Sequence, residues 1–406
     1  MKKFVSIFTI IIAMAINATA QWTLQTSGKT NDLRSVSFTD ANNGFAVGDD
    51  DGMGSGGMIL KTTNGGTNWT PQVSNTYSIL NSVHFTDANT GYIVGGSGTI
   101  LKTTNGGSNW TALTSGATGN LKSICFPNAT TAFVVGSGGT ILKTTNSGAN
   151  WTPQTSGKTT ILKSVYFITT TTGYAIGDSG TILKTINGGT NWIAQNSGLT
   201  GSSTNLNSVY FTDVNTGYAV GQSGKIIKTI NGGTNWIAQS SGVSNDIFSV
   251  YFVNANTGYA VGWTKILKTV NGGSTWTIQT SGISGTYDNL NAILFLDANT
   301  GYTVGNKGRI LKTINGGGVG ITENMAEKQI NVYPNPASDI VTLNIEDRNN
   351  EDLIINIYNV VGALVKTETL KHNNIQVNIG DLSNGVYLLT VKSKNLTANQ
   401  RLIIQR

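Results

Sequence analysis

The chain has 406 residues with 26 Lys and Arg, 20 Asp and Glu, two His and one Cys. Its length exceeds that of one ordinary domain and predicts one large and one small domain. Its single cysteine, Cys125, cannot form an internal disulfide and is expected to be a small strand residue, and its scattered lysines argue against a nucleic-acid-binding stripe.

Residues 1–20 are typical of a signal peptide. Lys2 and Lys3 precede an apolar run over residues 4–16, and Ala18-Thr19-Ala20 is a small-residue cleavage site. The apolar run is too short to cross a membrane as a helix. We therefore expect cleavage before Gln21 and no transmembrane segment in the mature chain.

A repeat occupies residues 21–320. The pattern Gly-Tyr-x-Val-Gly or a close variant begins seven times, about 41 residues apart in most cases, at Gly44, Gly91, Ala132, Gly173, Gly217, Gly258 and Gly301. One copy contains four short strand patterns, over residues 80–85, 91–95, 99–103 and 110–113, separated by Gly, Asn, Asp and Ser. This period and strand number are those of a β-propeller blade.

The turn between the third and fourth strand patterns carries a compact motif, Thr-x-Asn-Gly-Gly-x-x-Trp, as in residues 103–110. The side chain of Asn105 is expected to bond backbone N–H groups one or two residues on, and Trp110 to bury its ring against the blade. The motif resembles the Asp-box of sialidase-like propellers, with Asn in the Asp position. That resemblance implies a fold and not a chemistry.

The two ends of the repeat region complement each other. Residues 22–25 read as a fourth strand without a preceding three, and residues 313–317 begin the turn motif but no Trp follows. We therefore predict an all-β, seven-bladed β-propeller that is closed by its N-terminal strand, with an open solenoid as the alternative.

The repeated elements over residues 21–320 resemble those of the photosystem II stability and assembly factor-like propellers. The resemblance implies the fold and leaves the partner open. Its photosynthetic members use a basic, arginine-bearing patch on a membrane-protein partner. This propeller has only Arg34 and Arg309, so that role is not carried over.

A different domain follows the propeller. No Glu occurs in residues 21–320 and five occur after them, which places a boundary near residue 320 and a linker over residues 321–329. Residues 330–406 alternate β-formers with Asn and Gly turns, which predicts a small Ig-like β-sandwich.

This second domain resembles the type IX secretion C-terminal sorting domain, the alternative being an ordinary Ig-like accessory domain. The resemblance lies in Tyr333, Pro334, Asn335 and Pro336, in Gly385 and Tyr387, and in the terminal Arg406. It implies that the type IX secretion machinery is a partner. The protein would then be secreted or attached to the outer-membrane surface after signal-peptide cleavage.

Catalytic groups are scarce in the propeller. A sialidase needs three arginines, and a two-carboxylate glycosidase would have to use Asp alone. Asp40, Asp87, Asp213 and Asp297 share one turn position, and His84 lies in a strand pattern, so we expect no enzyme. The lysine that recurs in every Ile-Leu-Lys-Thr segment is expected to be solvated and structural.

Departures from the repeat are the candidate binding residues, because the repeated residues serve the scaffold. The loop with Asp49, Asp50 and Asp51 could hold Ca²⁺ or be a flexible acidic loop, and we expect no other cofactor. Trp263 stands in a second-to-third turn where the sister turns carry small or polar residues, and Tyr287 and Asp288 lie in a lengthened loop.

The two loops of each blade that join strand two to three and strand four to one are expected to share one face. A loop face that bears Trp and Tyr predicts a non-catalytic protein that binds a protein or a glycan. The alternatives are a polysaccharide hydrolase on a sialidase-like propeller and an assembly factor for envelope proteins.

Overall fold

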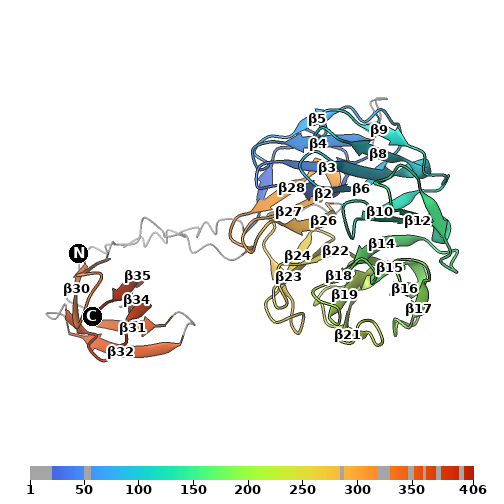
Figure 1. Ribbon diagram of the computed structural model, residues 1–406. Helices are drawn as coiled ribbons and strands as arrows, with labels where there is room; N and C mark the ends of the chain where they lie inside the picture. Colours follow the sequence, from blue (N-terminus) through green and yellow to red (C-terminus); the bar gives the residue numbers. More distant parts are fainter. Residues whose placement is uncertain are drawn as a thin grey trace, which may run out of the picture. The chain divides into compact units, whose positions relative to one another are not determined.

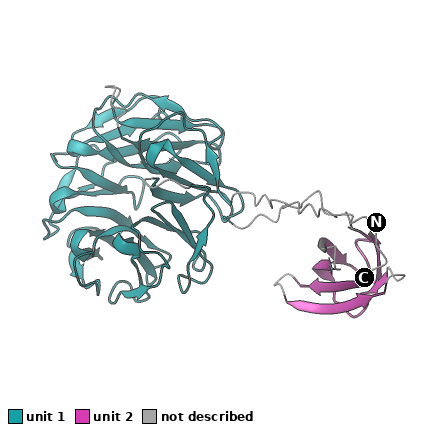
Figure 2. Cartoon of the chain, turned by 180° about the vertical axis from the view of Figure 1, so that it is seen from behind, with its two compact units in different colours: residues 1–320 teal, residues 321–406 magenta. Residues whose placement is uncertain are grey.

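The computed structural model describes residues 21–49, 56–283, 288–317, 330–345, 352–359, 363–371, 376–392 and 397–406. The chain divides into two compact units, residues 1–320 and 321–406, which Figure 2 colours teal and magenta. The predicted signal peptide and linker lie outside the described residues. No helix of the described part is long and apolar enough to span a membrane.

The first unit contains seven antiparallel four-stranded sheets, one for each predicted repeat. Blades one to three are β2 (Leu33–Phe38), β3 (Gly44–Gly48), β4 (Met58–Thr62), β5 (Thr70–Gln72); β6 (Leu80–Phe85), β7 (Gly91–Gly95), β8 (Ile100–Thr103), β9 (Thr111–Leu113); and β10 (Leu121–Cys125), β11 (Ala132–Gly136), β12 (Ile141–Thr144), β13 (Thr152–Gln154). Blades four to six are β14 (Leu162–Phe167), β15 (Gly173–Gly177), β16 (Ile182–Thr185), β17 (Ile193–Gln195); β18 (Leu206–Phe211), β19 (Gly217–Gly221), β20 (Ile226–Thr229), β21 (Ile237–Gln239); and β22 (Ile247–Phe252), β23 (Gly258–Gly262), β24 (Lys265–Thr269), β25 (Thr277–Gln279).

Blade seven confirms the predicted closure. It comprises β26 (Leu290–Phe295), β27 (Gly301–Gly305), β28 (Ile310–Thr313) and the N-terminal β1 (Thr23–Gln25), which pairs with β28. Trp22 takes the place of the missing motif Trp and is buried against Tyr259 and Phe295. Strand β26 also contacts β2, so the orange strands in Figure 1 meet the blue ones and the ring has no open end.

Aromatic stacking fills six of the seven interfaces between blades; between blades two and three, Tyr92 and Phe126 are tilted by 35°. The aromatic residue of the second strand lies flat on the Phe of the next blade's first strand, as in Tyr218 on Phe252, with ring centroids 4.0 Å apart. The motif Trp of that next blade meets the pair edge-on, as Trp276 meets Phe252 at 6.0 Å. This packing confirms that the sheets are buried on both faces, as the adjacent apolar residues Ile100 and Leu101 predicted.

The motif turn is held by its own side chains. Thr103 Oγ1 donates to Asn105 Oδ1 and accepts from Gly107 N, while Asn105 Oδ1 accepts from Asn109 N at 3.0 Å. The expectation that this Asn bonds N–H groups one or two residues on is therefore wrong, because the acceptor reaches four residues ahead and spans the whole turn. In blade six the same turn needs glycine at Gly273, whose φ is +82° and where a Cβ would lie 2.9 Å from the Tyr218 ring.

The repeated lysines link neighbouring blades. Each places Nζ over the aromatic ring of its own second strand and donates to a carbonyl in the next blade's motif turn, as Lys184 does to Gly232 O at 2.6 Å. Most blades add a Tyr hydroxyl on the same carbonyl, as with Tyr174 at 2.7 Å. The expectation that these lysines are solvated is wrong. They are half-buried, and each joins its own blade to the next one.

The second unit is the predicted two-sheet structure. One sheet contains β29 (Ile330–Tyr333), β30 (Ile340–Ile345) and β33 (Gln376–Asn378); the other contains β32 (Leu364–Leu370), β31 (Leu353–Tyr358), β34 (Gly385–Lys392) and β35 (Thr397–Ile404). Buried residues of both sheets, including Val341, Leu343, Ile355 and Leu389, form one core.

Candidate functional site

The two predicted loop sets share one face of the propeller. Short 3-10 turns join the second and third strands of five blades: η1 (Gly96–Gly98), η2 (Ser137–Gly139), η3 (Asp178–Gly180), η4 (Gln222–Gly224) and η5 (Asn306–Gly308). The N–H of Gly98 donates to Gly119 O in the following four-to-one loop, at 2.8 Å, and Gly308 does the same to Asn31 O. The face on which departures from the repeat were expected to gather therefore exists.

Blade six breaks this pattern at Trp263. The segment from Gly262 to Ile266 is one residue shorter than its counterpart from Gly95 to Ile100, and a tight turn of Trp263 and Thr264, with φ of 50° at Thr264, replaces the 3-10 turn. The backbone of Trp263 still donates to Asp246 O, and it forms a β-bridge with Asn289 of blade seven. The side chain is 37% exposed, which is unusual for so large a ring and makes Trp263 the leading site residue.

Asp288 precedes Asn289, the bridge partner of Trp263, but its side chain is buried and cannot contact a ligand. Its side chain is 1% exposed and lies between Arg309 Nη2, at 2.7 Å from Oδ2, and Lys307 Nζ, at 3.0 Å from Oδ1. Burial opposes ionisation, but the hydrogen bond from Lys307 and the charges of Arg309 and Lys307 hold the pKa of Asp288 below its ordinary value. The prediction that Asp288 is an exposed ligand contact is corrected: it positions the two cations.

The acidic loop is only partly described. Asp49 pairs with Arg34 of β2, the first strand of blade one, and Lys163 and Asp178 form the same pair in blade four at 2.7 Å. Asp50, Asp51 and Tyr287 lie outside the described residues. Within the part of the chain that the structure describes, no group of three acidic, His or Cys side chains is placed to hold a metal.

Trp263 occupies the position in its blade that the paired Asp49 and Asp178 occupy in theirs. Trp263, Asp49 and Asp178 each follow the last glycine of their blade's second strand. Lys122 of blade three occupies the strand position of Arg34 and Lys163 but has no ion-pair partner among the described residues. Its pKa is lowered by burial and by the charges of Arg34 and Lys163. Trp263 is therefore the one large apolar residue at a position where the other six blades carry Asp49, Gly96, Ser137, Asp178, Gln222 and Asn306.

His84, Cys125 and the turn aspartates have the structural roles that were predicted for them. His84 stacks on Phe126 with centroids 5.3 Å apart, and burial lowers its pKa to about 4. Burial raises the pKa of Cys125 to about 11, so the thiol is not activated. Asp87 Oδ1 accepts from the N–H groups of Asn89 and Thr90, as its sisters do in their turns, which confirms the turn role.

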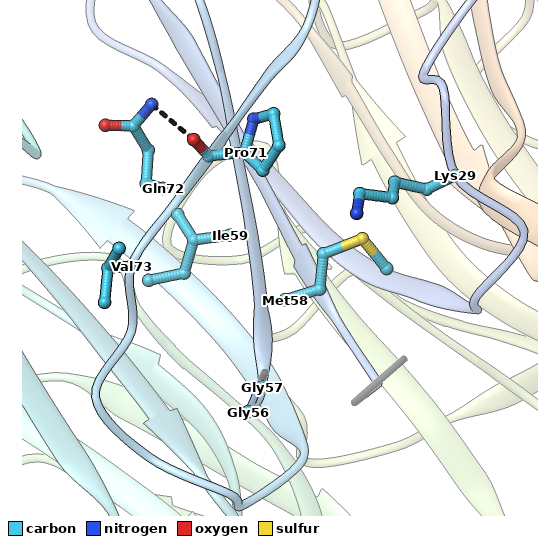
Figure 3. A pocket seen from close by; sticks show the side chains of 8 residues that line it. All are labelled: Lys29, Gly56, Gly57, Met58, Ile59, Pro71, Gln72 and Val73. Atoms are coloured by element: carbon cyan, nitrogen blue, oxygen red, sulfur yellow. Dashed lines mark hydrogen bonds between the residues drawn. The ribbon is translucent and has the colours of Figure 1, made fainter. Parts of the chain in front are cut away.

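One pocket lies at residues for which no binding site was predicted. It has a volume of about 210 Å³ and is walled by Met58, Ile59, Pro71 and Val73 of blade one, with Lys29 at its edge (Figure 3). A hollow in blade five is lined by the equivalent residues Ile226, Ala238 and Gln239. The pocket is therefore a groove of the repeated scaffold rather than a departure from it.

Sequence reasoning also missed Asn289, Lys307 and Arg309. Asn289 and Lys307 are ordinary polar residues at loop positions where several sisters also carry polar residues. Arg309 did give a signal, because it is one of only two arginines in the propeller and stands where three blades have Thr.

The sorting motif of the second unit ties its two ends together. Asn335 Nδ2 donates to Arg401 O at 2.7 Å, and its Oδ1 accepts from Ile403 N at 2.8 Å. The Arg406 guanidinium donates to the carbonyls of Leu382 and Ile379 at 2.8 and 2.9 Å. The last strand, which carries the terminal arginine, is thus fixed to the motif that opens the domain.

The other residues of the sorting motif make fewer contacts within the domain, and several of them are exposed. Tyr387 packs against the core and donates from its hydroxyl to Ser383 O at 2.9 Å. It stands on β34, which Gly385 opens. Tyr333 of β29 is 52% exposed, and Pro334 and Pro336 lie in the exposed turn that follows. Tyr333 and these prolines are therefore available at the surface.

Two family models match the chain. The model described as "Photosynthesis system II assembly factor YCF48" matches residues 14–159 and 146–240, and "Secretion system C-terminal sorting domain" matches residues 331–405. No curated protein matches the chain.

Solved propellers share the fold. "YCF48 bound to D1 peptide" is 24% identical with a TM-score of 0.61, over 73% of this chain and 95% of that one. "YCF48 from Cyanidioschyzon merolae" is 21% identical with a TM-score of 0.59, over 72% and 98%. The WD40 propeller domain of Doa1 is 13% identical with a TM-score of 0.58, over 72% and 96%.

Proposed function

The chain belongs to the photosynthesis system II assembly factor YCF48 family, and on that basis we propose that it is a non-catalytic propeller that binds a protein or a glycan outside the cell. Its C-terminal sorting domain indicates export to the cell surface or the medium and an interaction with the secretion machinery. Cleavage before Gln21 and delivery by the type IX route are the specific steps that we propose for this export.

Trp263 is the observation that carries the binding role. It exposes 37% of its surface in a turn that departs from the repeat, while the scaffold Trp of the same blade, Trp276, is present and buried. A large aromatic side chain that the fold does not need is a common anchor for a ligand. Lys307 of blade seven, with 56% of its side chain exposed, pairs with Asp288 and adds a cation to the same loop face.

The described carboxylates of the propeller support a non-catalytic role. Asp40, Asp87, Asp213 and Asp297 accept backbone N–H groups in their turns, Asp32 and Asp246 cap 3-10 turns, and Asp49, Asp178 and Asp288 pair with cations. A general acid in a glycosidase would instead need a raised pKa. The shifts resolved for Asp40, Asp87, Asp213, Asp288 and Asp297 are all downward.

A protein ligand has one specific argument in its favour. A solved propeller of the same fold is titled "YCF48 bound to D1 peptide", so a protein of this fold binds a peptide. If the ligand is a protein, the chain would act as an assembly factor for exported or envelope proteins.

Replacement of Trp263 tests the proposal. Trp263→Ala in the mature chain should weaken binding by about 2 kcal/mol with nearly unchanged Tm, because an exposed anchor contributes to the complex and little to the fold. Ile278→Ala is the matched control, since Ile278 is 53% exposed on β25 of the same blade. Binding would be measured on an oligosaccharide array and on blotted envelope proteins of the producing cell. A lower Tm with retained affinity would make Trp263 a packing residue.

A further inference from the structure

The polar side chains of the sorting motif are occupied inside the C-terminal domain. Both polar atoms of the Asn335 amide bond the backbone of the last strand, β35, at Arg401 O and Ile403 N. The Arg406 guanidinium donates to two backbone carbonyls of the same domain. These side chains therefore fix β35 in place, and a partner that recognises the domain must contact other residues.

The outward face of the sheet β32–β31–β34–β35 carries apolar residues at one end of the sheet (Figure 1). Side chains alternate along a strand, so the two neighbours of Tyr387, which packs against the core, point outward. These are Val386 and Leu388, which are 45% and 44% exposed. Val386 pairs with Ile403 of β35, which lies between two buried residues and faces the same way.

The strand register places these side chains next to each other. Leu388 pairs with Tyr358 of β31 on one side and with Arg401 of β35 on the other. Tyr358 also pairs with Leu364 of β32, which is 54% exposed. Directly opposed residues of antiparallel strands have Cβ atoms about 5 Å apart, so the side chains form one surface. We call this surface the sorting patch; it consists of Tyr358, Leu364, Val386, Leu388, Arg401 and Ile403.

The apolar character ends at the next row of the same face. That row joins Thr367, Asn356 and Thr390, and Thr367 Oγ1 donates to Asn356 Oδ1 at 2.7 Å. Ile354 lies beyond this row on β31 and is 48% exposed. Single exposed apolar residues such as Ile354 are ordinary, whereas a contiguous apolar cluster is typical of an interaction site.

Arg401 gives the sorting patch a positive charge. Its side chain is exposed and makes no ion pair or hydrogen bond with the described residues. Charges across a protein interface are usually complementary, so a carboxylate is expected on the partner opposite this guanidinium. The patch therefore fits a protein surface that combines apolar side chains with an acidic residue.

We infer that the sorting patch is the surface through which the C-terminal domain binds the secretion machinery, on a protein with that combination of side chains. The domain matches a family of secretion sorting domains over residues 331–405. The sorting motif is continuous with the patch, because Asn335 fixes the strand that contributes Arg401 and Ile403. This inference rests on the export role proposed above and names the residues that carry it.

The test measures export of the full chain in the producing cell. Threonine suits a strand, so the double variant Val386→Thr, Leu388→Thr should keep its Tm. Its amount at the cell surface should fall on the order of fivefold, and the chain should accumulate in the periplasm, because central apolar contacts dominate an interface. Ile354→Thr is the matched control, since Ile354 has the same exposure on the same face outside the patch, and its export should stay within about twofold of the parent.

Arg401→Glu decides the outcome if the double variant lowers Tm, because it changes an exposed charge without removing a packed side chain. It should reduce surface delivery more than Arg401→Gln does. Normal delivery of the double variant and of Arg401→Glu, together with loss of export on removal of residues 330–406, would overturn the sorting patch and leave the export role standing. An equal loss in Ile354→Thr would also overturn the patch. Normal delivery of the truncated chain would overturn the export role itself.

Discussion

The Nζ atom of Lys312 donates a hydrogen bond of 2.7 Å to the carbonyl oxygen of Gly65, although the two residues lie 247 positions apart in the chain. Lys312 belongs to blade seven and Gly65 to the motif turn of blade one. Tyr302 donates its hydroxyl to the same carbonyl at 2.9 Å. This one carbonyl therefore carries two of the bonds that close the ring.

The first prediction concerns this closure. Lys312→Met should lower the free energy of unfolding by about 2 kcal/mol, since hydrogen bonds from charged donors are among the stronger ones. Tyr302→Phe should cost less, because Phe45 and Phe133 already occupy this position in two other blades. The double variant should cost more than the sum, because it leaves the Gly65 carbonyl without either donor. Urea unfolding of the four proteins measures this, and strictly additive values would contradict it.

The N-terminal strand provides the second prediction. Deletion of residues 21–27 should lower Tm sharply, because blade seven loses β1 and the buried Trp22. Trp22→Ala alone should cost about 4 kcal/mol, the usual range for a buried large aromatic. Leu24→Ala is the control within the same strand, since Leu24 is 61% exposed and should be close to neutral. An unchanged melting curve after the deletion would refute closure by this strand.

The third prediction is a pH dependence from His84. Burial lowers its pKa from an ordinary 6.5 to about 4 in the folded protein. The unfolded chain therefore takes up a proton below pH 6.5 while the folded chain stays neutral. The free energy of unfolding should fall by about 3 kcal/mol between pH 6.5 and 4 and level off below that window.

His84→Phe is the variant that isolates this contribution, because a Phe can keep the stack on Phe126 and does not titrate. The difference in stability between the variant and the parent should grow as the pH falls from 6.5 to 4. Parallel stability curves over that range would mean that the His84 environment is not as dry as the structure indicates.

The fourth prediction concerns export. A chain without residues 330–406 should keep the Tm of its propeller, because the two units have separate cores. It should remain in the periplasm instead of reaching the surface. Cell fractionation and surface labelling measure this, with the intact chain as control. Normal amounts of the truncated chain at the surface would exclude the sorting role.

The sequence by itself determined the number of blades, the strand order and the closure. Each blade repeats a local pattern, and a period of about 41 residues together with complementary ends allows one ring. The turn role of Asp40, Asp87, Asp213 and Asp297 could also be predicted, because those bonds join residues two or three positions apart. The residues and resemblance that mark the C-terminal domain are likewise contained in one short stretch.

Only the tertiary structure decided which side chains meet across a blade junction. A lysine such as Lys184 reaches a carbonyl 48 residues away, and Asp288 is buried and paired with Arg309 rather than exposed in its loop. Asn289 stands where Asn120 and Asn205 accept an N–H of the preceding blade's turn, but its Oδ1 has no partner among the described residues. The turn that it meets, Trp263 and Thr264 of blade six, is one residue shorter. Such contacts form because closure of the ring brings turns of different blades together. Local sequence patterns do not show which residues of different blades lie within contact distance.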